Sequence, residues 1–262
     1  DPIWVLSLTE GLSKLLVPHR RPLIAYCEDR DGVTHRLFPL AEPESVALVA
    51  EAVAASPVVL ADGHHRFETA CTYRDERLAA GIDDFGAGRI MAFAAELAED
   101  ELSVRPIHRL LHGVAGIDVR DALTGAFTVV DNGPNTPDGI TELRRRMQDQ
   151  DALGLVDGSG LALLRPTSEV TDEPEVLRDV DSTRFDARVR PALRGATVTF
   201  RSDAAAVAAL IEKGAADAAV LLRPVGVAQI RAAAFAGVRM PEKTTFFSPK
   251  PRTGIVFRSL DD

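Results

Sequence analysis

The segment Asp62-Gly63-His64-His65-Arg66 gathers an acid, two imidazoles and a guanidinium around one glycine. The apolar residues Pro57 to Ala61 before it are typical of a buried strand, and Phe67 to Ala80 after it are typical of a helix. Where a strand leads through a glycine turn into a helix, unpaired backbone N–H groups and the positive end of the helix dipole favour an anion. We therefore predict that this segment, the motif turn, binds a phosphate or a carboxylate.

The motif turn also fits a purely structural hypothesis. Asp62 could serve only as a helix N-cap and Gly63 only as a residue with positive φ, followed by a solvated first turn. Adjacent histidines in a helical turn point to different faces, so His64 and His65 are not expected to chelate one metal ion together. The pattern therefore disfavours a zinc site.

The segment from Ala61 to Ala70, ADGHHRFETA, resembles the signature of a bacterial and archaeal family, domain-of-unknown-function family 1015. Three further segments resemble the same family: SVRPIHRL at 103–110, MPEKTTFFSPK at 240–250 and TGIVF at 253–257. Together they extend the resemblance from about residue 20 to the end of the chain. Members of that family carry a further N-terminal region, where a catalytic group could reside.

The core of the motif turn is also similar to the phosphate-binding motif of the ParB and sulfiredoxin superfamily, most closely its free-serine kinases, over about residues 35 to 75. In those proteins the motif opens a helix whose N-terminus holds nucleotide phosphates. This resemblance implies a ParB/sulfiredoxin-like N-terminal part, a small-molecule substrate, and ATP or ADP with Mg²⁺ as cofactors.

Composition sets outer bounds on the class of protein. A chain of 262 residues can hold two modest domains, and its net charge of -9 argues against broad nucleic-acid binding. Its two cysteines, Cys27 and Cys71, suit a reducing compartment. Because no apolar run reaches the length of a membrane span and no signal-peptide pattern opens the chain, we expect no membrane partner and a cytoplasmic location.

The order of elements predicts a mixed α/β fold in two parts. The first, residues 1–115, would hold the phosphate site, and the second, residues 116–262, would be a further α/β part. In the first part we predict a hairpin from Pro22 to Leu40, a helix from Glu42 to Ala55, and strands at Ile90 to Leu97 and Leu102 to Pro106.

In the second part, short strands are predicted at Phe127 to Val130 and Leu161 to Leu164. The charged segment Ser168 to Gly195 is interpreted as a loop region and as a candidate boundary or mobile flap. Beyond it, alternating strands and helices predict partly parallel strands. Gly254 to Leu260 would add a closing strand.

A basic loop, residues 240–253, is a second candidate for anion binding in this acidic chain. Lysines and hydroxyls within a dozen residues are suited to a phosphorylated ligand, here Lys243, Thr244, Thr245 and Lys250. The alternative is a solvated loop whose phenylalanines pack into the core. We predict that Lys243, Thr245 or Lys250 lies near the motif turn and closes one shared pocket.

The leading functional hypothesis is a nucleotide-dependent kinase that phosphorylates a small hydroxylated metabolite, with free serine as the first candidate. Asp62 would bind Mg²⁺ or orient the acceptor, as one of four candidate catalytic residues: Asp62, His64, Glu68 and His108. Phosphates would be held by the following residues of the motif turn, a strand end and the basic loop: Gly63, His64, His65, Arg66, Arg109, Lys243, Thr244, Thr245 and Lys250. For His108 and Arg109, packing at a strand end is the structural alternative.

Two other classes of function use the same residues. A regulatory protein could bind a nucleotide or a phosphorylated metabolite at the motif turn without turnover. A metal-dependent hydrolase could use Asp62 and His108 with His64 or His65, but only if these groups converge in the fold.

Overall fold

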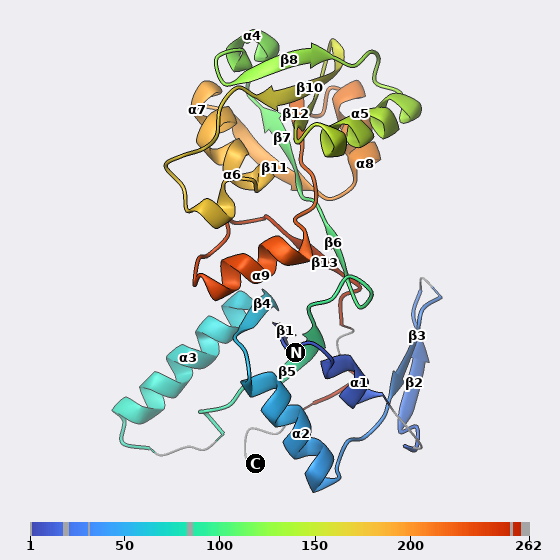
Figure 1. Ribbon diagram of the computed structural model, residues 1–262, viewed down its shortest axis with the longest axis vertical. Helices are drawn as coiled ribbons and strands as arrows, with labels where there is room; N and C mark the ends of the chain where they lie inside the picture. Colours follow the sequence, from blue (N-terminus) through green and yellow to red (C-terminus); the bar gives the residue numbers. More distant parts are fainter. Residues whose placement is uncertain (1, 18–20, 31, 83–85, 252–253, 258–262) are drawn as a thin grey trace. The chain divides into compact units, whose positions relative to one another are not determined.

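The computed structural model describes residues 2–17, 21–30, 32–82, 86–251 and 254–257 (Figure 1). The chain divides into two compact units, one made of residues 1–103 and 249–262 and the other of residues 104–248. This division differs from the predicted parts 1–115 and 116–262. Strand β7, His108–His112, belongs to the sheet of the second unit, and the C-terminal residues return to the first. Helices and sheets occur in both units, which confirms the mixed α/β class.

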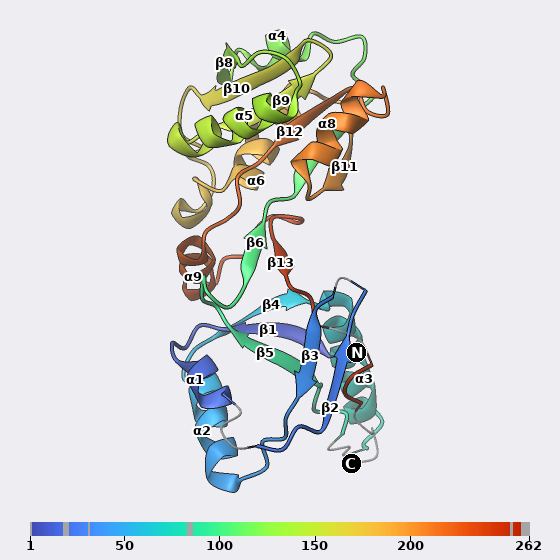
Figure 2. The ribbon, with the colours of Figure 1, turned by 90° about the vertical axis from the view of Figure 1, so that its right-hand side faces the viewer.

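The first unit is built on a three-stranded sheet with the order β4-β1-β5 (Figure 2). The central strand β1, Ile3–Ser7, runs antiparallel to β4, Val58–Asp62, and parallel to β5, Ala92–Glu96. All five residues of β1 are buried, as its apolar sequence and central position require. Trp4 pairs with Asp62, so the first residues of β1 lie beside the last residue of β4.

Helices and a separate hairpin complete the first unit. The predicted hairpin is present as an antiparallel pair, β2 and β3, and the predicted helix after it is present as α2. Glu96 accepts hydrogen bonds from the backbone N–H groups of Gly11 and Ser13, both at 2.9 Å, and so caps the short helix α1. Glu96 lies beside the last residue of β1, at the opposite end of this strand from Asp62. The bounds are α1 Leu12–Leu16, β2 Ala25–Glu28, β3 Thr34–Leu37, α2 Pro43–Ala54 and α3 His64–Ala79.

The second unit contains a six-stranded sheet with the order β11-β7-β12-β9-β10-β8. Its neighbouring strands pair antiparallel throughout, so the predicted parallel strands do not lie side by side. The elements of this sheet and its two long helices are β8 Phe127–Asp131, α5 Pro137–Asp149, β9 Leu153–Asp157, β10 Gly160–Pro166, β11 Thr197–Arg201, α8 Ala204–Glu212 and β12 Ala218–Leu221.

The predicted alternation of strand and helix exists, but in each strand–helix–strand motif a third strand lies between the two strands. β11 and β12, joined by α8, both pair with β7, which lies between them. In the same way β8 and β9, joined by α5, both pair with β10. Each strand–helix–strand unit therefore has parallel strands that are not neighbours, which is a split β-α-β arrangement.

Helices cover both faces of this sheet (Figures 1 and 2). On one face, α5 and α8 pack their apolar residues against the strands. On the other face lie α4, Val119–Leu123, and residues of the segment Ser168 to Gly195. The loop prediction describes residues 168–174, but the later part of the segment is helical and packed, because Val180, Phe185, Val189 and Leu193 are buried. Its helical pieces are η1 Glu175–Leu177, α6 Asp181–Arg184, the π-helical η2 Phe185–Val189 and α7 Arg190–Ala192.

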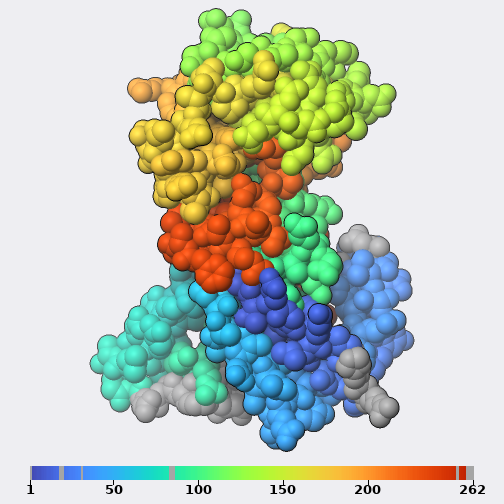
Figure 3. Space-filling model, viewed as in Figure 1, coloured from blue at the N-terminus to red at the C-terminus, as the bar shows by residue number. Residues whose placement is uncertain are grey.

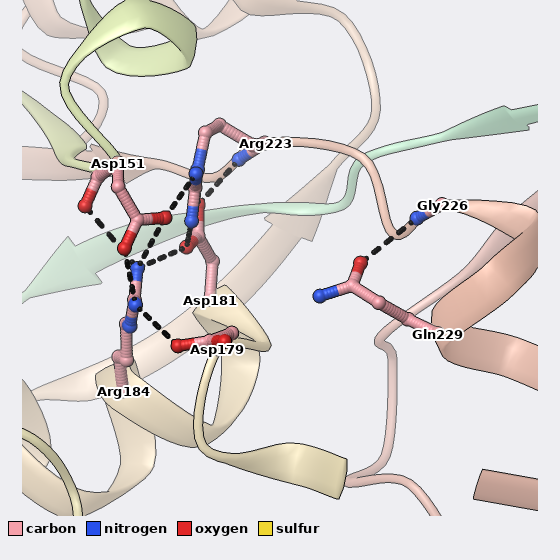
Figure 4. Close-up of polar contacts among 7 residues, drawn as sticks. All are labelled: Asp151, Asp179, Asp181, Arg184, Arg223, Gly226 and Gln229. Carbon is pink, nitrogen blue, oxygen red and sulfur yellow. Dashed lines mark hydrogen bonds and ion pairs between the residues drawn. The ribbon is translucent and has the colours of Figure 1, made fainter. Parts of the chain in front are cut away.

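A network of charges around the buried residues Asp181 and Arg184 fixes α6 to the sheet (Figure 4). Asp181, whose side chain is 3% exposed, accepts hydrogen bonds from the backbone N–H and the guanidinium of Arg223, just after β12. Arg184 binds Asp151, a residue with φ of 51°, and Asp179. Buried charges require such partners, so the network ties α6, the start of β9 and the end of β12 together.

Two further elements belong to the second unit, α9, Val227–Phe235, and β13, Phe246–Ser248, and β6, Ser103–Arg105, begins at the boundary between the units. β6 pairs with β13, next to the two points where the chain passes between units. The closing strand predicted at Gly254 to Leu260 is not formed by residues 254–257, and its last residues lie outside the described part. Among the described residues, no helix combines the length and apolar character needed to cross a membrane.

Candidate functional site

The motif turn connects β4 to the sixteen-residue helix α3 (Figure 1). Gly63 adopts φ of 91° at the N-cap position, and α3 begins at His64, three residues before the predicted start. Phe67 N–H donates to Gly63 O at 2.9 Å, the first bond of the helix. The N–H groups of the three residues between them therefore have no acceptor within the helix, which is the predicted geometry for holding an anion.

Asp62, the last residue of β4, is held from two sides. Its Oδ1 accepts the Gly63 N–H at 2.9 Å, and its Oδ2 accepts a hydrogen bond from Lys250 Nζ at 3.0 Å. Partial burial raises the pKa of Asp62, but the hydrogen bond and charge of Lys250, the Gly63 N–H and the charge of Arg66 lower the pKa overall. Asp62 is therefore a carboxylate at neutral pH, facing a cation.

Arg66 folds back beneath the motif turn. Its Nη2 donates to Pro2 O at 3.1 Å, just before β1. A side chain at Gly63 would place its Cβ 2.8 Å from Arg66 Nη2 and 3.1 Å from Ile3 Cγ2. Glycine is therefore favoured here by its positive φ, and any larger residue would have to displace the Arg66 side chain. The role of Pro2 and Ile3 was not predicted, because β1 itself was not.

The two histidines and Glu68 lie on the exposed first turns of α3, a helix that is exposed along most of its length (Figure 3). His65 Nδ1 is 3.4 Å from Glu68 Oε2, and these side chains are 100% and 65% exposed. His64 is exposed as well. The structure thus leaves His64, His65 and Glu68 available to a ligand at the motif turn.

The basic loop is divided between the two units. Lys250 lies in the first unit and contacts Asp62, so one of these residues lies near the motif turn as predicted, while the shared pocket stays a prediction. Lys243 and Thr245 belong to the second unit. Thr244 is buried there, with its hydroxyl 2.7 Å from Ser182 Oγ and 2.6 Å from Pro241 O. Thr244 is therefore a packing residue and not a phosphate ligand, and residues 252–253 of the loop lie outside the described part.

His108 and Arg109 are structural residues of the second unit, contrary to the predicted catalytic and phosphate-binding roles. Both lie in β7 and are at most 2% exposed. His108 Nδ1 accepts the Leu222 N–H at 3.1 Å. Arg109 donates to the carbonyl oxygens of Ile107 and Lys243, the latter at 2.9 Å, and its guanidinium packs on two aromatic rings. Both residues therefore fit the structural alternative, in which they pack at a strand end.

His108 should make the second unit sensitive to acid. Burial, with the positive charges of Arg144 and Arg109, lowers its pKa from 6.5 to about 4, against an opposing effect of Asp203. The unfolded chain then binds more protons than the folded chain between these values, so stability is lost as the pH falls. We expect His108 to account for a loss of about 2–3 kcal/mol between neutral pH and about pH 4.5.

The variant His108→Gln, which keeps an acceptor for the Leu222 N–H, should lack this part of the pH dependence. Urea unfolding of both proteins at the two pH values measures it directly. An equal loss of stability in the variant would show that other groups are responsible.

The motif turn offers one carboxylate to a metal ion. Mg²⁺ is commonly held by one or two carboxylates together with substrate phosphates, so Asp62 fits such a site as a single ligand. No group of three or more histidine, cysteine, aspartate or glutamate side chains able to hold a metal converges within the described part of the chain. Asp62, His64 and His65 lie in the first unit, whereas His108 is buried in the second.

A family model described as "Protein of unknown function (DUF1015)" matches residues 2–183. The chain belongs to this family, as the motif turn predicted. The matched region begins earlier than residue 20 and ends before the two C-terminal segments that also resemble the family. No curated protein matches the chain.

Several solved structures are similar to the chain at low identity. A conserved hypothetical protein from Pyrococcus furiosus has a TM-score of 0.44 and 13% identity, covering 72% of this chain and 69% of that one. A free serine kinase in complex with AMP has a TM-score of 0.43 and 13% identity, covering 80% and 81%. A variant free serine kinase in complex with ADP has a TM-score of 0.41 and 13% identity, covering 79% and 81%.

Proposed function

We propose that this chain is a phosphotransferase that uses a nucleotide to phosphorylate a small hydroxylated metabolite, with free serine as the first candidate. The observation that carries the proposal is the geometry of the motif turn: Gly63 with φ of 91°, between a strand and a sixteen-residue helix, and Lys250 Nζ 3.0 Å from Asp62. Free N–H groups at a helix start beside a lysine are suited to a phosphate. The resemblance of the same five residues to the motif of free-serine kinases supports the substrate class.

Each residue of the site has a part in this reaction. Backbone N–H groups from His64 to Arg66 would hold the phosphates, and Lys250 would spread the charge of the transferred group. A bond forms between the acceptor oxygen and phosphorus as the bond to the leaving nucleotide breaks, and the hydroxyl proton passes to Asp62 or Glu68. When bound, Mg²⁺ would neutralise phosphate charge beside Asp62.

A regulatory binder is the second candidate. The observation in its favour is that His108, one of the four predicted catalytic residues, is buried in the second unit. Holding a nucleotide requires only the motif turn and Lys250, whereas transfer also requires groups that move a proton and orient the acceptor. Binding without consumption of nucleotide would identify this class.

The two candidates are separated by one assay. ATP or ADP, Mg²⁺ and serine are incubated with the protein, and phosphoserine is followed by phosphorus NMR. We expect Asp62→Asn and Arg66→Ala each to lower the rate about tenfold or more, which corresponds to about 1.4 kcal/mol in the barrier. Asp75→Asn, which removes an exposed charge further along α3, is the control. Nucleotide binding without transfer to serine or other hydroxylated metabolites would contradict the kinase proposal and favour the binder.

A further inference from the structure

The ion pair between Asp62 and Lys250 joins the motif turn to the C-terminal segment of the first unit. The two side chains are 42% and 50% exposed, with Nζ and Oδ2 3.0 Å apart. Lys250 follows β13 by two residues, where the chain re-enters the first unit. The pair is therefore accessible to a ligand that arrives from solvent at the motif turn.

The Asp62 carboxylate has the same kinds of hydrogen-bond donor around it that a bound phosphate would have. The carboxylate of Asp62 takes one N–H of the turn, from Gly63 at 2.9 Å, and one ammonium, from Lys250. A phosphate group seeks the same kinds of donor, since backbone N–H groups at a helix start and a lysine are its common partners. Asp62 thus supplies from within the chain the negative charge that a ligand would otherwise bring.

We infer that the carboxylate of Asp62 competes with the ligand's phosphate for Lys250, and that binding transfers the ammonium from Asp62 to the phosphate. The inference rests on the proposed function, namely that the motif turn binds a phosphate. An exposed ion pair is weak and easily broken, and a lysine ammonium is a point charge on a flexible stem. A phosphate at the helix start offers Lys250 more negative charge than one carboxylate does.

Loss of the Asp62 charge should increase the affinity for a phosphate. Asp62→Asn leaves a side chain of similar size, removes the competing charge and abolishes the ion pair with Lys250. Binding of a phosphate without metal should therefore become tighter, although the same variant is expected to transfer phosphate more slowly. If Asp62 served only to bind Mg²⁺, its removal would not change binding in the absence of metal.

The test is calorimetric titration with ADP in the presence of a chelator, so that no divalent ion contributes. We expect Asp62→Asn to bind ADP about tenfold more tightly than the unmodified protein and Lys250→Met to bind it about tenfold more weakly. In the double variant the gain should disappear, because Lys250, for which the two anions compete, is gone. Asp75→Asn and Lys14→Met remove exposed charges of the same unit and should leave the affinity within about twofold.

Each outcome has a distinct meaning, provided that circular dichroism shows folded variants. Unmodified protein that binds ADP, with Asp62→Asn binding no tighter, overturns the competition and leaves the phosphate site intact. A gain that persists in the Lys250→Met background also overturns it, because simple repulsion would then suffice. Absence of ADP binding in every variant overturns the proposed phosphate site and the competition together.

Discussion

Replacing Gly63 by valine is expected to weaken ADP binding about a hundredfold or more, corresponding to about 2.7 kcal/mol. Two effects add at this position. A β-branched residue at φ of 91° is strained, and its Cβ would meet Arg66 Nη2 at 2.8 Å and Ile3 Cγ2 at 3.1 Å. Relief of that contact moves the guanidinium away from Pro2 and changes the direction of the N–H groups that hold the phosphate. Calorimetric titration with ADP measures the loss.

Gly81 provides the matched control for this prediction. It lies just beyond α3 with φ of 71°, and a Cβ there meets nothing within 4 Å. Gly81→Val therefore carries similar backbone strain without touching the motif turn, and it should bind ADP normally. Equal losses in the two variants, or a folded Gly63→Val with unchanged affinity, would contradict the site.

Replacing Asp181 by alanine should lower the free energy of unfolding by about 3–5 kcal/mol. The change leaves Arg223 and Arg184, whose side chains are 14% and 7% exposed, without their buried carboxylate partner. α6 would lose its link to the end of β12, and with it part of the packing of one sheet face (Figure 4). Urea unfolding followed by circular dichroism gives the size of the effect.

Asp179 tests whether burial is the cause. It binds the same Arg184 at 3.0 Å but is 76% exposed, so Asp179→Ala should cost no more than about 1 kcal/mol. A similar loss in both variants would mean that the number of ion pairs, and not their burial, stabilises this region.

Local signals in the sequence were sufficient to predict the motif turn. An apolar strand, a glycine and a helix follow one another there, and each is visible within a window of a few residues. The start of α3 was placed three residues late because the histidines and arginine lack apolar periodicity. The contact of Lys250 with Asp62 spans 188 residues, and it was expected only because an acidic chain concentrated cations in one loop.

Long-range pairing explains the predictions that the structure corrected. Local alternation predicts partly parallel strands, but whether β7 and β10 enter between two such strands depends on the whole sheet. His108 was interpreted as a residue beyond a strand, whereas it begins β7. In Ser168 to Gly195, charged residues conceal apolar ones at Phe185, Val189 and Leu193, which share one side of a helical path.

The central claim is that backbone N–H groups of the motif turn hold a phosphate, and amide NMR during titration with ADP tests it most directly. The account predicts saturable shifts of the His64, His65 and Arg66 amide signals, with an affinity equal to that from calorimetry. In Gly63→Val the same signals should shift only at ADP concentrations about a hundredfold higher or more. Saturable binding of ADP without shifts at His64 to Arg66 in the unmodified protein would contradict the account and place the nucleotide elsewhere.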